Sequence, residues 1–426
     1  MLPLVLFMTL MLLFLLNTPI ALAIGMASLL ALWLHGDLPL MMVIQRLYAG
    51  VDSFPLMAVP LFMCAGAVME AGGISRRVVQ LAESIVGWLP GGLAAVAVVS
   101  AMFFAGISGS AAADTAAVGA ILIPSMIRRG YDRGFAAAVQ AAGGSIGVVI
   151  PPSIPMIIFG FLTGASVGKL FAAGILPGLL MGVSLIGVAT ALSWKNRYST
   201  VVAFSWRRLA QCAWEAKWAM GAPVVILGGI LSGVFTATES AAAANFYALF
   251  VGLWVHRELR WRNLPELFVR SAVTASLVLF IIATASIFSW FMAIEDIPAR
   301  VARGLLAVTT HPMALLMLIN GVLLAAGTFV ETTAALILLV PVLLPLVPTL
   351  GVEITQLGAI VVVNLAIGML TPPLGICLVV SCTLAQCRLE KVIARIGPFL
   401  AVLLVDLVLI SLWSPLTLWI PSLLHR

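Results

Sequence analysis

The chain has 426 residues, of which 63% are hydrophobic and only 9% are charged. Soluble globular proteins carry about 25% charged residues, so this composition excludes a large soluble core. The net charge of +6 arises from Lys and Arg in short polar segments, which is typical of membrane-protein loops rather than of a nucleic-acid-binding surface. No Lys or Arg occurs in residues 1–45, 78–127 or 304–387, and a membrane span needs about 20 apolar residues. We therefore predict an all-α polytopic membrane protein.

The amino-terminal segment is apolar from its start, with an interruption at Asn17-Thr18-Pro19. The first basic residue is Arg46, so we expect no cleaved signal peptide. A second span is predicted over residues 54–69. The apolar segment 85–127 follows, and Gly106-Ile107-Ser108-Gly109-Ser110 interrupts it. Glycine lets the backbone leave helical torsion angles, so a helix break is predicted there.

Two motifs later in the chain share a pair of adjacent prolines. They are Gly147-Val148-Val149-Ile150-Pro151-Pro152 and Gly368-Met369-Leu370-Thr371-Pro372-Pro373. Proline lacks a backbone donor and clashes with the preceding helical turn, so each pair should break a helix. Lipid cannot satisfy the freed backbone groups, and such a break survives only against protein or a polar cavity. Broken helices in corresponding positions of two halves indicate the binding site of a secondary transporter.

A basic segment with several tryptophans, residues 194–218, divides the chain nearly in half. Its composition predicts an amphipathic connector at the membrane interface. Residues 220–255 then have room for two crossings, with an interruption at residues 233–239. Further apolar segments complete the chain at residues 271–294, 312–350, 355–386 and 396–420.

The two halves of the chain can be aligned. Asp114-Thr115 in the first half corresponds to Glu331-Thr332 in the second, and Pro124 and Pro341 are separated by the same number of residues. Three arginines form the loop before the first proline segment, whereas the equivalent stretch of the second half, residues 346–353, has no basic residue. Arg388, Lys391 and Arg395 instead follow the second proline pair. Because cytoplasmic loops collect Lys and Arg, the two proline segments should cross the membrane in opposite directions. Such an inverted repeat is the construction of many secondary transporters, and it favours a carrier over a channel.

Small residues, hydroxyls and a carboxylate gather at each predicted break. Hydroxyls and freed backbone carbonyls are hard oxygen ligands, and unwound carbonyls hold Na⁺ in transporters of this design. The alternative for the Ser, Thr and Gly residues is close helix packing. Asp114, Glu239 and Glu331 are carboxylates in apolar surroundings, which makes each a functional candidate or a helix cap. Asn364 either lines the second break or makes an interhelical hydrogen bond.

Enzymatic chemistry finds little support in the sequence. Gly106-x-Ser108-Gly109 resembles the serine motif of intramembrane proteases, but the histidines that would supply a base lie near predicted loops or the terminus. The spacing of Cys377, Cys382 and Cys387 is not a zinc pattern. We therefore expect no catalytic residue, no cofactor and no disulfide framework.

These features together resemble the large membrane subunit of tripartite ATP-independent periplasmic (TRAP) transporters. The resemblance covers essentially the whole chain and rests on residues 106–117, 147–154, 233–244 and 364–375. It implies a multi-pass protein of the bacterial inner membrane, in the wider ion-transporter superfamily, with re-entrant hairpins, broken helices and an elevator movement. It also implies uptake of organic acids, such as carboxylates or sugar acids, with Na⁺ as the coupling ion. The implied partners are a small four-helix membrane subunit, a periplasmic substrate-binding protein and the lipid bilayer.

The repeats and the resemblance together suggest domains and site residues. We expect scaffold helices in residues 1–84, a first transport-domain repeat in 85–169, scaffold helices with the connector 194–218 in 170–303, a second repeat in 304–387, and a C-terminal helix in 388–426. The ion- and substrate-binding candidates are Ser108, Gly109, Ser110, Asp114, Thr115, Pro151, Pro152, Ser153, Gly327, Thr328, Glu331, Thr332, Asn364, Thr371, Pro372 and Pro373. Na⁺ is expected near Ser108, Ser110, Thr328 and Thr371. The alternative function is a proton-coupled or binding-protein-independent organic-anion carrier, in which an intramembrane carboxylate would titrate.

Overall fold

The computed structural model describes residues 2–16, 18–36, 39, 41–198 and 203–424. Every regular element among these residues is a helix, and no strand occurs in them. Six helices are long and apolar enough to cross a membrane, or seven if the bent pair Met41–Val51 and Pro55–Ala71 is one span. The prediction of an all-α polytopic membrane protein is confirmed. Asn17 and residues 199–202 of the expected connector lie outside the described part of the chain.

The amino-terminal helices break at prolines. Pro19 directly precedes α2, since proline is tolerated at the start of a helix but not in its interior. At Pro55 the chain enters a short 3-10 turn, and the helices on either side of this turn are bent by 65°. The elements of this region are α1 (Leu2–Leu15), α2 (Ile20–His35), α3 (Met41–Val51), η1 (Pro55–Met57), α4 (Ala58–Ala71) and α5 (Ile74–Val86).

The first repeat consists of a helical hairpin and a broken helix, and a long helix follows them. The hairpin turns at Gly109, whose φ of +66° favours glycine, and Ser110 caps the helix that follows. The broken helix is interrupted at Pro151-Pro152, and Ser153 caps its second half. The elements are α6 (Gly92–Ser108), α7 (Ala111–Arg128), α8 (Arg133–Ser145), η2 (Ile146–Val148), α9 (Ile154–Thr163) and α10 (Val167–Lys195).

The second repeat has the same order of elements. Its hairpin turns at Val330 and Glu331, and Glu331 caps the helix that follows. Its broken helix is interrupted around Pro372-Pro373, and both proline pairs of the chain contain a cis peptide bond. The elements are α15 (Pro312–Phe329), α16 (Thr332–Leu343), η5 (Leu344–Leu346), α17 (Val347–Leu350), α18 (Ile354–Gly368), α19 (Ile376–Ala385), α20 (Leu389–Leu412) and α21 (Pro415–Leu423).

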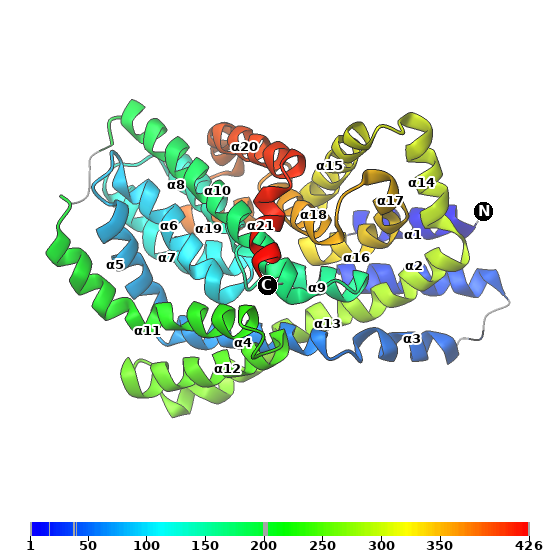
Figure 1. Cartoon of the computed structure of the whole chain (residues 1–426), viewed down its shortest axis with the longest axis horizontal. Helices are drawn as coiled ribbons and strands as arrows, with labels where there is room; N and C mark the ends of the chain where they lie inside the picture. The colour runs from blue at the N-terminus through cyan, green and yellow to red at the C-terminus, as the bar shows by residue number, and fades with distance from the viewer. Residues whose placement is uncertain (1, 17, 37–38, 40, 199–202, 425–426) are drawn as a thin grey trace.

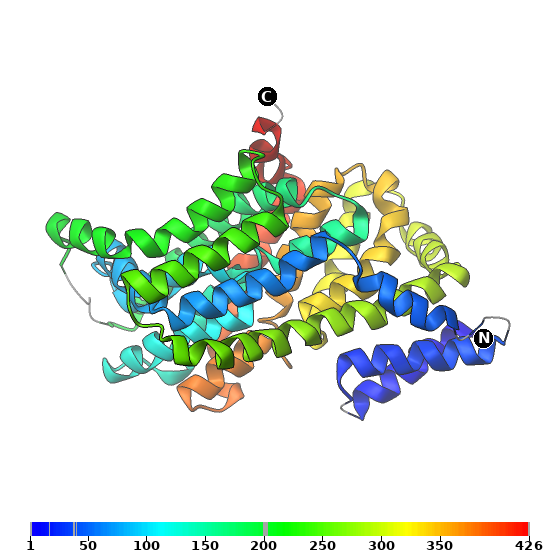
Figure 2. The same cartoon turned by 90° about the horizontal axis from the view of Figure 1, so that it is seen from below.

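Three of the helices between the repeats, α11, α12 and α13, border one side of the molecule. Figure 1 shows α11, α12 and α13 along its lower edge together with α3 and α4, and Figure 2 shows the same group in front. The predicted interruption at residues 233–239 separates α11 from α12, where Thr236 and Glu239 form a capping box. Glu239 is exposed, so its structural role is that of a cap. The elements are α11 (Trp206–Leu231), α12 (Ala237–Phe250), the π-helical η3 (Val251–Val255), η4 (Trp261–Asn263), α13 (Leu264–Ile294) and α14 (Ile297–Val308).

The second half of each broken helix packs against the other repeat. α9 contacts α16 and α18, whereas α19 contacts α7 and α8. Figure 1 shows α9 close to α16 on the right and α19 beside α6 and α7 on the left. The fit is close, since a Cβ on Gly358 of α18 would lie 2.8 Å from the Phe159 ring of α9. This exchange joins the repeats through their interiors and is the arrangement that a two-fold relation between them produces.

The start of α8 and the loop before it are tied to the end of α19. Arg133 Nη1 donates hydrogen bonds to the carbonyls of Ala385 and Gln386, each at 3.3 Å. Arg395 of α20 forms an ion pair with Asp132 of the same loop, with an N–O distance of 3.4 Å. The last carbonyls of a helix have no partner within the helix, so Arg133 supplies one across the repeats.

Candidate functional site

The hairpin turn and the proline break of the first repeat meet at Gly109. The Gly109 carbonyl accepts a hydrogen bond from Ile154 N at 3.4 Å. A Cβ on Gly109 would lie 2.7 Å from the carbonyl oxygen of Pro152, which is closer than side chains approach. A residue without a side chain is therefore required where these two segments touch, and the two helix ends share one location.

Asp114 supplies the carboxylate beside the hairpin turn and the proline break of the first repeat. It lies in the first turn of α7, is fully buried, and accepts a hydrogen bond from the Ser108 hydroxyl through Oδ1. The Ser108 oxygen accepts in turn from Ser110 N at 3.1 Å. Oδ2 of Asp114 has no hydrogen-bond partner among the described residues, and it lies against Gly147 at the first proline break. A buried carboxylate oxygen without a donor is energetically costly, so this oxygen suits a cation.

The second repeat brings its two breaks together through glycines. A Cβ on Gly368 would lie 2.6 Å from Gly327 Cα, so the two backbones touch. Glu331 stands at the hairpin turn, and its Oε2 accepts from Thr333 N at 2.9 Å and from Ala334 N at 3.3 Å. Its Oε1 accepts from the Thr333 hydroxyl at 3.1 Å. The Glu331 carboxylate is therefore satisfied as a helix cap.

The predicted threonine hydroxyls bond to their own helices. Each donates to a carbonyl about one turn earlier, at 2.8 Å for Thr115, 2.7 Å for Thr328 and 3.0 Å for Thr371. Ser153 donates to a carbonyl on the other side of the proline pair. Thr332 Oγ1 is buried and has no partner within the described part of the chain. A hydroxyl that donates its proton keeps lone pairs, so these oxygens retain ligand capacity.

Asn364 belongs to a buried amide network of which the sequence analysis named only one member. Asn364 Nδ2 donates to the backbone oxygen of Asn320 at 2.9 Å and to its Oδ1 at 3.2 Å. Asn320 Nδ2 donates to Ser411 Oγ at 2.9 Å, so the network joins α18, α15 and α20. Asn364 thus makes an interhelical bond, while Thr371 bonds to its own helix. An amide in an apolar helix needs a partner, so the residue type of Asn320 indicated a polar contact, although the sequence could not say with which residue.

The reciprocal packing places the first break beside the second. Thr115, in the first turn of α7, lies next to Cys377, in the first turn of α19 just after the second proline pair. On the other side, α9 begins after the first proline pair and packs against α16 and α18. The start of α7, after the first hairpin turn, and the start of α19, after the second proline pair, are therefore neighbours.

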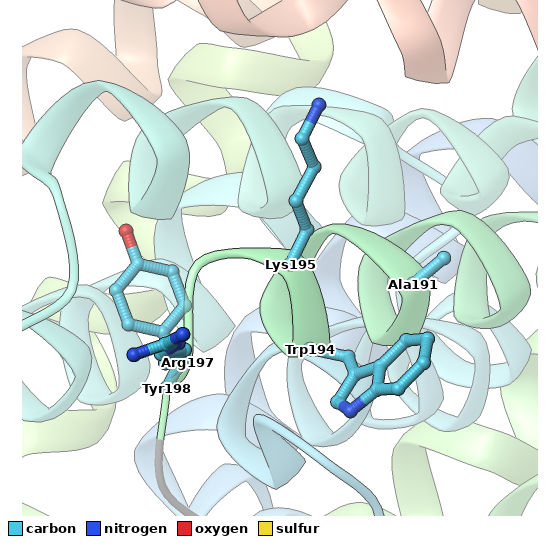
Figure 3. Close-up of a pocket in the computed structure, with 5 residues that line it drawn as sticks. All are labelled: Ala191, Trp194, Lys195, Arg197 and Tyr198. Atoms are coloured by element: carbon cyan, nitrogen blue, oxygen red, sulfur yellow. The ribbon is translucent and has the colours of Figure 1, made fainter.

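A separate surface pocket of about 800 Å³ lies at the end of α10. Figure 3 shows its lining residues Ala191, Trp194, Lys195, Arg197 and Tyr198, with the Lys195 and Trp194 side chains pointing in different directions. Basic and aromatic side chains of this kind are typical of the membrane–water interface. This pocket contains none of the predicted ion- or substrate-binding residues.

Two broken helices brought together by repeats inside an all-helical membrane protein define a secondary membrane transporter. Among solved structures, the YdaH transporter of Alcanivorax borkumensis, described as having an unusual topology, matches with a TM-score of 0.63. Its sequence identity is 16%, over 88% of each chain, so this likeness concerns the fold.

The sequence comparisons give the family. The profile of the tripartite ATP-independent periplasmic transporter, DctM component, matches residues 7–416. The isethionate TRAP transporter permease protein DctMQ of Oleidesulfovibrio alaskensis is 43% identical over 94% of this chain, which spans 63% of that longer protein. The C4-dicarboxylate TRAP transporter large permease protein DctM of Pseudomonas aeruginosa is 37% identical over 94% of each chain. The sialic acid TRAP transporter large permease protein SiaM of Vibrio cholerae is 36% identical over 89% of each chain.

The chain belongs to the DctM family, the large membrane subunits of TRAP transporters. This confirms the resemblance, and it identifies the chain as a multi-pass transport protein of the bacterial inner membrane rather than an enzyme. The assignment of individual residues to ions or substrate stays a prediction.

Proposed function

We propose that the chain is the large permease subunit of a sodium-coupled, binding-protein-dependent importer of organic acids. The observation that carries this proposal is the buried oxygen set at the first break. Asp114 Oδ2 is buried without a donor in the described structure, beside the Ser108 hydroxyl and the freed carbonyls around Gly109. Hard oxygen donors of this kind fit Na⁺, and the negative charge of Asp114 would offset the positive charge of the ion.

The substrate class is inferred from the relatives. Those named for isethionate, C4-dicarboxylates and sialic acid act on organic anions. Carrying a cation with the anion lowers the net charge that crosses the bilayer, where a single charge costs at least about 2.5–3.5 kcal/mol. Co-transport of Na⁺ with a small organic acid therefore lowers the free-energy cost of moving the anion across the bilayer.

The family description supports the proposed partners. A tripartite system includes a periplasmic component, and DctMQ of O. alaskensis is a longer permease of which this chain matches only a part. We therefore propose a small four-helix membrane subunit and a soluble substrate-binding protein as the partners of this chain. In an elevator movement, the repeats of residues 85–169 and 304–387 would travel together, because each holds the second half of the other's broken helix.

Uptake into proteoliposomes containing both membrane subunits tests this function. Radiolabelled organic acids, presented with the binding protein, should accumulate only when an inward Na⁺ gradient is imposed. Omitting the binding protein or replacing Na⁺ by choline should reduce the initial rate to the level of empty liposomes. Equal uptake driven by a proton gradient without Na⁺ would support the proton-coupled alternative, and uptake without the binding protein would support an independent anion carrier.

A further inference from the structure

Two cysteines lie side by side at the end of α19, away from the helix breaks. Cys387 N donates to the carbonyl of Cys382 at 3.3 Å, and Gln386 between them has a φ of +49°, so the chain folds back there. Both are free thiols, and both line the same pocket. The fold of the helix end therefore keeps the two cysteines close together.

Both thiols line one surface pocket of about 380 Å³. This volume is within the range of about 300–1,000 Å³ that holds small-molecule ligands. Cys382 is 8% exposed, whereas Cys387 is half-buried. A molecule in the pocket therefore reaches the Cys387 sulfur first.

The charged residues around Cys382 and Cys387 favour an anionic ligand. Arg133 Nη1 donates to the carbonyl of Gln386, the residue before Cys387, at 3.3 Å, and Lys391 lies one turn into the helix that follows. Asp132, the residue before Arg133, is paired with Arg395 at 3.4 Å. Glu390 faces Cys382, the more buried thiol. The positive-inside rule places these basic loops in the cytoplasm, where thiols are kept reduced and disulfides are transient.

We propose that Cys382 and Cys387 form a thiol–disulfide exchange site for an anionic low-molecular-weight disulfide of the glutathione class. The Cys387 thiolate attacks one sulfur of that disulfide, forms a mixed disulfide and releases one small thiolate, which takes up the proton that Cys387 lost. The Cys382 thiol then attacks the Cys387 sulfur, forms an internal disulfide and transfers its proton to the second departing thiol. Two protein thiols are oxidised and one small disulfide is reduced to two thiols.

The first step depends on pH in a defined direction. Burial raises the pKa of the Cys387 thiol, and Asp132 acts in the same sense, while the Cys382 thiol, Lys391 and Arg133 oppose the shift. The thiolate is therefore the minor form at neutral pH. Because the thiolate is the nucleophile, the rate of mixed-disulfide formation should rise about tenfold per pH unit below this pKa.

The full-length chain in lipid nanodiscs, incubated with glutathione disulfide and mapped by mass spectrometry, tests the proposal. Wild-type protein should form the internal Cys382–Cys387 disulfide. The Cys382→Ser variant should accumulate one glutathionyl group on Cys387, and the Cys387→Ser variant should leave Cys382 unmodified. Cys212, which lies on α11, is the control thiol and should not enter an internal disulfide.

Three results would overturn the exchange site. They are a glutathionyl group on Cys382 in the Cys387→Ser protein, a wild-type protein that stops at the mixed disulfide, and a wild-type protein in which neither cysteine reacts. Tryptophan fluorescence of each variant checks that the serine substitutions leave the fold intact.

Discussion

The sequence alignment matched Asp114 with Glu331, but the structure gives the two carboxylates different places and surroundings. Glu331 directly precedes α16, so both of its oxygens accept bonds from the first turn of that helix. The residue that caps the equivalent helix of the first repeat is Ser110, and Asp114 lies further along, inside the first turn of α7. One oxygen of Asp114 is left without a partner in the described structure. In the second repeat the carboxylate thus caps a helix, whereas in the first repeat a hydroxyl caps the helix and the carboxylate stays open to a ligand.

The largest expected effect is on Asp114. Replacing it by Asn keeps the side-chain shape but removes the charge that would offset a cation. Interactions with charged groups contribute about 1.5–3 kcal/mol, so initial uptake should fall about 10- to 100-fold in Asp114→Asn. The matched variant Glu331→Gln should keep most of its uptake, with both proteins quantified in the membrane by immunoblot. Wild-type uptake by Asp114→Asn would remove the distinction between the two breaks.

A second substitution tests whether the second break is held by backbone contact. Gly368→Ala places a Cβ 2.6 Å from Gly327 Cα, and overpacking of this kind costs about 1–3 kcal/mol. We expect a lower thermal midpoint in detergent and slower uptake. Gly321→Ala in α15 is the control, because nothing lies within 4 Å of its added Cβ. If both variants melt at the same temperature, the glycine contact does not hold the breaks together.

The smallest effect concerns the cap itself. Glu331→Ala removes the acceptor for the first backbone donors of α16 and should lower stability by about 1 kcal/mol. Asp is also a favourable capping residue, so Glu331→Asp should recover most of this loss. Denaturation in mixed micelles measures both variants. Equal destabilisation by Ala and Asp would indicate that Glu331 does more than cap the helix.

Local chemistry explains which parts of the fold could be predicted. The proline pairs and the glycine at residue 109 placed the helix breaks, because they act on their own segment of backbone. The contact of Gly327 with Gly368, the bond from Arg133 to the end of α19 and the Asn320 network join residues far apart in the chain, so no local pattern indicated them. Helix capping was one of two roles left open for Glu239, and its side chain is exposed in the structure because the polar segment before α12 carries it.

The candidate site could be predicted in part. Residue types at the breaks indicated oxygen ligands, and the structure brings Ser108, Asp114 and Gly109 to one location. It also shows that Asn364 bonds to Asn320, a partner that depends on how α15 and α18 cross. The Na⁺ ligands, the substrate contacts and the limits of the moving domain stay predictions, since each depends on a bound or alternate state.

The exchange of half-helices between the repeats has a consequence for how the protein is made. The ribosome completes α9 long before α16 and α18, its eventual packing partners, leave the exit tunnel. A short apolar helix of ten residues, too short to span the bilayer, therefore has only its first-half partners, such as α10, to pack against until the second repeat is synthesised. By the same geometry, an ancestor with one repeat would have completed its fold only as a pair of oppositely inserted copies.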